Sequence, residues 1–104
     1  MSTGNGRPSF QVVYSELVRQ QLKQLLQSPD LAGREEQALK ALKAIERRLR
    51  KEPRTFGEPE FSLASAQLEV RTAVEPPLAV TWAVHKHKAV VFVKTFTLLE
   101  KGPP

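Results

Sequence analysis

The sequence predicts an α+β fold in which a helical hairpin packs on one face of a small, mainly antiparallel sheet. Three observations lead to this prediction: an alternating apolar segment near the start, two segments of helical periodicity, and three strand-like segments at the end. The predicted order is therefore β-α-α-β-β-β. A chain of 104 residues can bury one modest core. We expect a disordered leader at 1–9, a single domain at 10–99 and a flexible tail at 100–104.

The first half of the chain predicts one strand and two helices. The stretch "FQVVYS" alternates apolar with other side chains, which predicts a strand at about 10–15. From Glu16 the apolar residues recur every three to four positions, as in a helix, until "SPD" at 28–30 ends the pattern. A second helix is predicted from near Gly33, and Pro53 stops it after the basic turn "RRLRK".

Three strand candidates follow the Pro- and Gly-marked connection 54–66. They are "QLEVRTAV", "LAVTWAVH" and "AVVFVKTFTL". In the first of them, Leu68 and Val70 are expected to face inward, with Glu69 and Arg71 outward.

The last strand candidate is apolar on both faces, as in a strand buried on both sides, and we expect it to be central in the sheet. Val90, Phe92 and Phe96 share one face, and Val91 and Val93 share the other. Because the helices can cover only one side of the sheet, an apolar face is left over. Either a partner covers it or the connection 54–66 folds across it.

Composition limits the protein's chemistry and its surroundings. The chain has no cysteine, which excludes disulfides and thiolate sites and fits a reducing compartment. It has no apolar run long enough to cross a membrane and no signal peptide, so we expect a cytoplasmic protein. No cofactor is indicated. The net charge of +5 favours an acidic partner, although a basic surface alone would also explain it.

The arrangement of these segments resembles the RelE/ParE toxin superfamily of type II toxin–antitoxin modules. The resemblance lies in "FQVVYSELVRQQLKQL", in a basic helix ending "LRKEP", and in "LEVRTAVEPPLAVTWAVHKHKAVVFVKTF". It covers nearly everything from Phe10 to about Leu98, and it concerns element order and apolar pattern. It implies a toxin that cleaves messenger RNA on the ribosome or acts on DNA gyrase, held inactive by an acidic antitoxin.

The family's catalytic residues are poorly matched in this chain. By the resemblance, Ala79 takes the place of a catalytic arginine, with Trp82 as the aromatic residue that follows it. Family lysines and a terminal tyrosine also lack counterparts, because Gln67, Glu69 and Leu99 occupy those positions. Arg71 is the one cation retained, and it is the only catalytic candidate.

RNA cleavage by attack of the 2′-hydroxyl needs proton-transfer groups and cations around the phosphate. With several of these groups missing, two functions remain open. The chain is either an active toxin, or an inactive member of the fold that binds protein or nucleic acid. A third alternative is an unrelated enzyme that uses His85 and His87.

The second helix carries the strongest candidate contact surface. Lys40, Lys43, Arg47 and either Arg50 or Lys51 can share one flank of it. All five are candidate contacts for RNA phosphates or an acidic antitoxin. Arg71 is added to this contact set. The alternative is an ordinary solvated face with helical ion pairs.

Two smaller groups of residues each have a structural and a functional interpretation. The stretch "HKHK" at 85–88 fits a solvated hairpin turn better than a metal site, because no third ligand is evident and the lysines repel cations. Tyr14 and Trp82 could stack on bases, but both occupy inward positions of predicted strands, which favours core packing.

Overall fold

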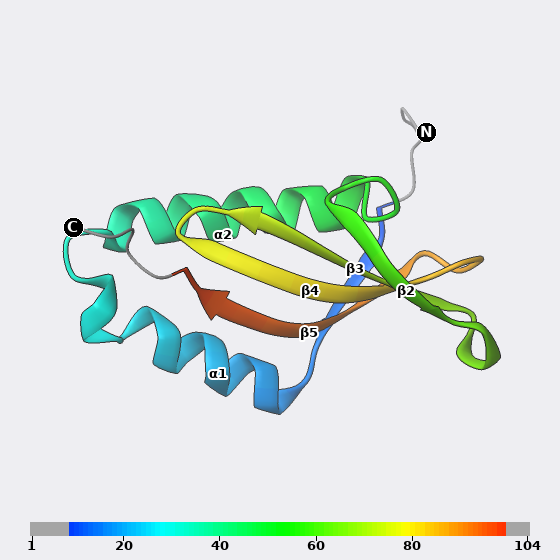
Figure 1. The fold of residues 1–104 in the computed structure, drawn as a ribbon, viewed down its shortest axis with the longest axis horizontal. Helices are drawn as coiled ribbons and strands as arrows, with labels where there is room; N and C mark the ends of the chain where they lie inside the picture. The colour runs from blue at the N-terminus through cyan, green and yellow to red at the C-terminus, as the bar shows by residue number, and fades with distance from the viewer. Residues whose placement is uncertain (1–8, 100–104) are drawn as a thin grey trace, which may run out of the picture.

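The computed structural model describes residues 9–99, so most of the predicted leader and all of the predicted tail lie outside the described residues. The fold is α+β, with two helices and one five-stranded mixed sheet (Figure 1). The elements follow in the order β1 (Gln11–Tyr14), α1 (Glu16–Leu26), α2 (Glu35–Lys51), β2 (Glu58–Leu63), β3 (Leu68–Glu75), β4 (Leu78–His85) and β5 (Val90–Leu98). Short 3-10 turns precede α2 and β3.

The predicted order needs one correction, because the connection 54–66 contains an additional strand, β2. The sheet order is β1-β5-β4-β3-β2, with β1 parallel to β5 and the other neighbours antiparallel. The prediction of a mainly antiparallel sheet is therefore confirmed. β5 is an interior strand between β1 and β4, but the central position that was predicted for it belongs to β4. β2 was missed because Pro59 and two glutamates interrupt its pattern, a composition that an edge strand tolerates.

Both helices contribute to the core on one face of the sheet. α1 packs chiefly on β5, while α2 contacts β1, β3 and β4. The buried stripe of α2 follows helical periodicity and consists of Ala38, Ala41, Ile45 and Leu49. In α1 only Val18 is fully buried, and Leu22 and Leu25 are half-buried against the core. Neither described helix is both long and apolar enough to span a bilayer.

The side chains of β3 that face the helices are the set that was predicted to face outward. Arg71 and Ala73 face the helix side, in register with Trp82 and Val80 of β4. Val70 is also buried, but on the other face of the sheet. The alternation of side chains in β3 was predicted correctly, but the pattern alone does not tell which face meets the helices. An arginine such as Arg71 can lie on the buried face when its donors are satisfied.

The predicted assignment of β5 side chains to the two sheet faces is wrong beyond a β-bulge. Thr81 pairs with Thr95 and Trp82 pairs with Val93, which leaves Lys94 as an extra residue. Beyond the bulge the alternation changes phase, so Phe96 joins Val91 and Val93 on the helix face. Phe92 remains 40% exposed on the other face, so β5 is not buried on both sides.

Candidate functional site

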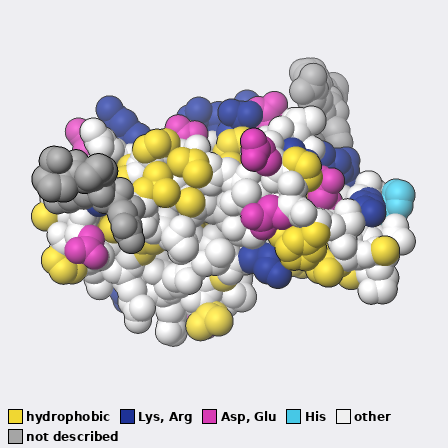
Figure 2. Space-filling view, in the orientation of Figure 1, with side chains coloured by type: hydrophobic (Ala, Val, Ile, Leu, Met, Phe, Trp, Pro, Cys, Tyr) yellow, Lys and Arg dark blue, Asp and Glu magenta, His cyan; other side chains and the backbone are white. Residues whose placement is uncertain are grey.

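The five cations predicted on the second helix all lie exposed on α2. Lys40, Lys43, Arg47, Arg50 and Lys51 occupy one arc of roughly 100° at 3.6 residues per turn, on the side opposite the buried stripe. Figure 2 shows Lys and Arg side chains along the edge of the molecule where Figure 1 places α2. We call these five residues the cationic face.

No carboxylate of residues 9–99 is ion-paired with this face, although the exposed Glu36 lies on the same arc, one turn before Lys40. Glu46 accepts a hydrogen bond of 2.8 Å from the Tyr14 hydroxyl, and Glu52 is paired with Arg48. Within residues 9–99, no carboxylate lies within the 4.0 Å of an ion pair to any of the five cations. The positive charge of α2 is therefore available to an external anion.

Arg54 joins the end of α2 to the turn between β4 and β5. Its guanidinium donates to the carbonyl oxygens of His85, at 3.1 and 3.3 Å, and of Lys88, at 3.2 Å. The guanidinium also lies over the Phe10 ring, 4.8 Å from its centroid. Because the Phe10 amide donates to the Arg50 carbonyl at 2.8 Å, the basic turn lies at the same end of the molecule as the last turn of α2.

Sequence reasoning missed Arg54. The available signal was an arginine directly after the helix-ending Pro53, in a chain with a second basic cluster at 85–88. Nothing local in the sequence pairs these two segments. The contact spans 31 residues and depends on the sheet, which places the β4–β5 turn beside the end of α2.

The "HKHK" segment forms the predicted hairpin turn, with His85 holding it together. The Nδ1 atom of His85 accepts hydrogen bonds of 3.0 Å from the amides of His87 and Lys88. Desolvation of the ring, and then the positive charges of Lys88, His87 and Arg54, lower the pKa of His85. No group of three or more metal-ligating side chains occurs in the described part of the chain.

Arg71, the retained catalytic candidate, is 7% exposed and hydrogen-bonded within the domain. Its Nε donates to the Phe56 carbonyl at 2.9 Å, and the two terminal nitrogens donate to the Gly57 carbonyl at 3.1 Å and to Glu69 at 2.9 Å. This arrangement fixes the 56–57 segment against β3. It does not bring Arg71 to the cationic face, whose five members point to solvent from α2.

The positions that replace the family's catalytic groups lie at two ends of β4, with Ala79 and Leu99 near its start and Gln67 near its end. Ala79 pairs with Val74 and Thr97 on the sheet face away from the helices. Gln67 adopts a left-handed conformation in the turn before β3, and the Leu99 amide donates to the Pro77 carbonyl at 2.8 Å. No proton-transfer pair is assembled among them.

Tyr14 and Trp82 are packed on the helix side of the sheet. Trp82 is fully buried, its indole Nε1 donates to the Pro53 carbonyl at 3.1 Å, and its ring stacks on Phe56 at 5.1 Å. Burial, and then the hydrogen bond and charge of Glu46, raise the pKa of the Tyr14 hydroxyl. Core packing is confirmed for Trp82, and the half-buried Tyr14 ring packs at the margin of the core.

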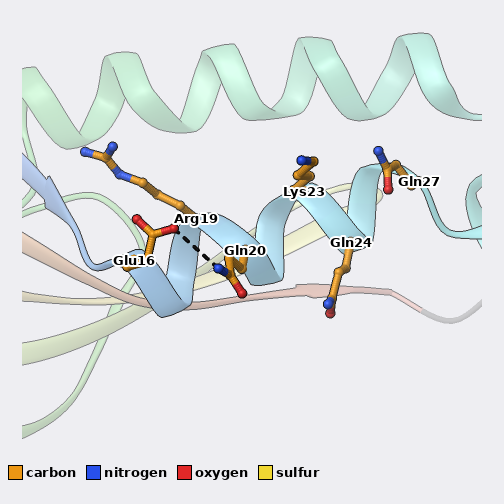
Figure 3. A pocket seen from close by; sticks show the side chains of 6 residues that line it. All are labelled: Glu16, Arg19, Gln20, Lys23, Gln24 and Gln27. Carbon is orange, nitrogen blue, oxygen red and sulfur yellow. Dashed lines mark hydrogen bonds between the residues drawn. The ribbon is translucent and has the colours of Figure 1, made fainter.

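A shallow hollow of about 390 Å³ lies along α1. Its lining is polar and of mixed charge, with Arg19 and Lys23 directed toward α2 and Gln24 directed away (Figure 3). The six lining residues are Glu16, Arg19, Gln20, Lys23, Gln24 and Gln27. The hollow offers no apolar floor and no convergent set of groups, so it does not resemble a small-molecule site.

Comparison with protein-family models, curated proteins and solved structures gives no match to this chain. The functional argument therefore depends on the surfaces themselves. The described residues offer an extended positive surface and no assembled catalytic group, which is an arrangement suited to binding an anionic macromolecule.

Proposed function

We propose that this chain is a RelE/ParE-like domain that serves in the cytoplasm as a binding module, with the cationic face of α2 as the docking surface for an acidic protein of the antitoxin kind. The observation that carries the proposal is the set of five exposed cations on one arc of α2 without a carboxylate partner among residues 9–99. The β-α-α order followed by antiparallel strands supports the resemblance, with β2 as an addition.

A binding function is favoured over toxin chemistry by the state of the candidate groups. The donors of Arg71 are used inside the domain, and Ala79 supplies no charge. Losing one transition-state donor commonly costs about 10²-fold in rate, and here several are missing together. An acidic polypeptide, by contrast, needs only an accessible field of positive charge.

The docking surface is tested with poly-L-glutamate as the acidic probe, by titration over a range of salt concentrations. Reversal of charge in Lys43→Glu/Arg47→Glu should weaken binding about tenfold and flatten the salt dependence. The matched control, Lys43→Arg/Arg47→Lys, keeps the charge at both positions and should behave as the wild type. An unchanged salt slope in the reversed variant would remove α2 from the interface.

Two further measurements separate this proposal from its alternatives. Stronger binding to polyuridylate than to poly-L-glutamate would assign the surface to nucleic acid instead. Induced expression in a bacterial culture should leave growth unimpaired at confirmed soluble expression. Prompt growth arrest would support the toxin function and overturn the binding-only proposal.

A further inference from the structure

No described helix lies on the sheet face opposite α1 and α2, although Val70 and Ala83 on that face are buried. β2 is the edge strand beside β3, and all six of its residues are exposed. Phe92 is 40% exposed and Phe61 is 51% exposed. Exposed aromatic side chains gathered on one face commonly mark an interaction surface. We call this surface the open face.

An apolar row crosses the open face in register. Phe61 pairs with Val70, Val70 with Ala83, and Ala83 with Phe92. The row thus has a large aromatic side chain on each outer strand, β2 and β5, and smaller buried side chains on β3 and β4 between them. This distribution is symmetric about the line between β3 and β4.

A polar row beside it has the same symmetry but carries opposite charges at its ends. Glu58 pairs with Thr72, Thr72 with Thr81, and Thr81 with Thr95, whose hydroxyl donates to Gln21 of α1 at 3.1 Å. The bulge residue Lys94 adjoins Thr95. Glu58 and Lys94 are both exposed. A row with a carboxylate at one end and an ammonium at the other is complementary to a reversed copy of itself.

The open face is unsuited to the anionic partner proposed for α2. No lysine or arginine occupies a paired strand position on this face; the bulge residue Lys94 adjoins it, and Glu58 offsets its charge. The strands lie in front of the helices in Figure 1, so Figure 2 views the open face, with the cations of α2 along its rim. A nearly neutral, apolar occupant fits this face better than a nucleic acid or an acidic peptide does.

The free edge of β2 is also a poor site for strand addition. Pro59 supplies no amide donor, and the pairing register with β3 shifts between Pro59 and Phe61. Prolines and bulges are devices by which edge strands avoid pairing with other chains. An occupant should therefore lie on the open face and not extend the sheet.

We propose that the open face binds a second copy of this chain, in a symmetric face-to-face dimer. A two-fold axis parallel to the strands and between β3 and β4 would place the exposed Phe61 over Phe92 of the partner subunit. The same axis places Glu58 opposite Lys94 of the partner subunit. Each contact occurs twice.

The size of the face sets the expected strength of the dimer. Four strands about 4.8 Å apart and about 20 Å long give a contact of roughly 20 by 20 Å, well below the 2,000 Å² or more of obligate dimers. The dimer should therefore dissociate on dilution. Its hydrophobic contribution is concentrated in the two aromatic pairs.

Sedimentation velocity over a concentration series tests the dimer with the full chain. The wild type should approach twice the 11.7-kDa chain mass at high concentration, and Phe92→Glu should remain a monomer. Leu17→Glu introduces the same charge at an exposed leucine of α1 and should dimerise as the wild type does. Circular dichroism shows whether each variant is folded.

A charge exchange tests the orientation of the two copies. Glu58→Lys and Lys94→Glu should each weaken the dimer, whereas the double exchange should restore it, because the opposed pairs are reformed with reversed sign. A wild type that stays monomeric at its highest soluble concentration would overturn the proposal. A dimer that survives Phe92→Glu, or a double exchange that fails to restore association, would overturn the assigned face or axis.

Discussion

The Nε atom of Arg71 donates a 2.9 Å hydrogen bond to the carbonyl oxygen of Phe56, and thereby ties β3 to the segment that follows α2. Replacement by methionine keeps much of the side-chain volume but leaves the Phe56 and Gly57 carbonyls and the Glu69 carboxylate without a donor. We expect Arg71→Met to lower the free energy of unfolding by about 2–4 kcal/mol.

Urea unfolding followed by the fluorescence of Trp82, the one tryptophan, measures this loss. Exposed Arg47→Met is the matched control, and we expect it to change the stability by less than about 0.5 kcal/mol. Equal stability of the two variants would mean that Arg71 is not a structural anchor.

Gly57 is required by both its backbone conformation and its surroundings. Its φ is +69°, and a Cβ there would overlap the Thr72 carbonyl oxygen. Gly33 has a similar φ of +83° but open space around it. We therefore expect Gly57→Ala to cost about 2–4 kcal/mol and Gly33→Ala about 1 kcal/mol, by thermal or urea unfolding. A similar cost at both sites would show that backbone strain alone governs them.

Tyr14 should ionise only when the domain unfolds. Because the fold raises the pKa of its hydroxyl, the stability from Tyr14 is fully present below the ordinary pKa of about 10 and is lost as the pH rises above it. As Tyr14 is the only tyrosine, phenolate absorbance reports it alone. The absorbance change should coincide with unfolding seen by circular dichroism. Ionisation of the Tyr14 hydroxyl near pH 10 in the folded domain would contradict this expectation.

The Tyr14 hydroxyl should also stabilise the domain at neutral pH. Tyr14→Phe removes its 2.8 Å hydrogen bond to Glu46 and should cost about 1 kcal/mol. Tyr14→Phe/Glu46→Gln should cost little more than the first change alone, because the two residues share one interaction. Fully additive losses in urea unfolding would exclude that coupling.

The β4–β5 turn should loosen in acid. The fold lowers the pKa of His85, so the stability from its neutral ring is present above the ordinary value of about 6.5 and is lost as the pH falls through the lower value in the fold. Protonation of Nδ1 removes the acceptor for the amides of His87 and Lys88. Their hydrogen exchange, corrected for the intrinsic rate, should accelerate below pH 6.5.

A pair of variants assigns this response to one ring. His85→Asn supplies an acceptor that does not titrate and should abolish the pH response, whereas His87→Gln leaves the Nδ1 acceptor in place and should keep it. Loss of the response in His87→Gln alone would assign it to the other histidine.

The sequence was informative where local pattern determines structure. The periods of three to four residues after Glu16 and Gly33 predicted both helices, and the alternation in β3 predicted a strand. The bulge at Lys94 and the strand β2 could not be found in this way, because both depend on pairing with a distant segment.

The features of the candidate site also fall into those that local pattern predicts and those that depend on tertiary structure. The exposure of the five cations of α2 follows from the helical period, since they lie opposite an apolar stripe. The placement of Arg54 at the β4–β5 turn and the burial of Arg71 are tertiary properties. The local sequence pattern therefore does not predict either of them.

The two surfaces lie on opposite sides of the sheet, with the cationic face on a helix and the open face formed by bare strands. A face-to-face pair of chains would consequently direct its two α2 helices away from each other. Such a particle is bivalent: it can engage two sites on one long polyanion, or bridge two separate acidic partners. Its effective affinity would then rise with protein concentration more steeply than that of a monomer, through avidity and without any additional contact on α2.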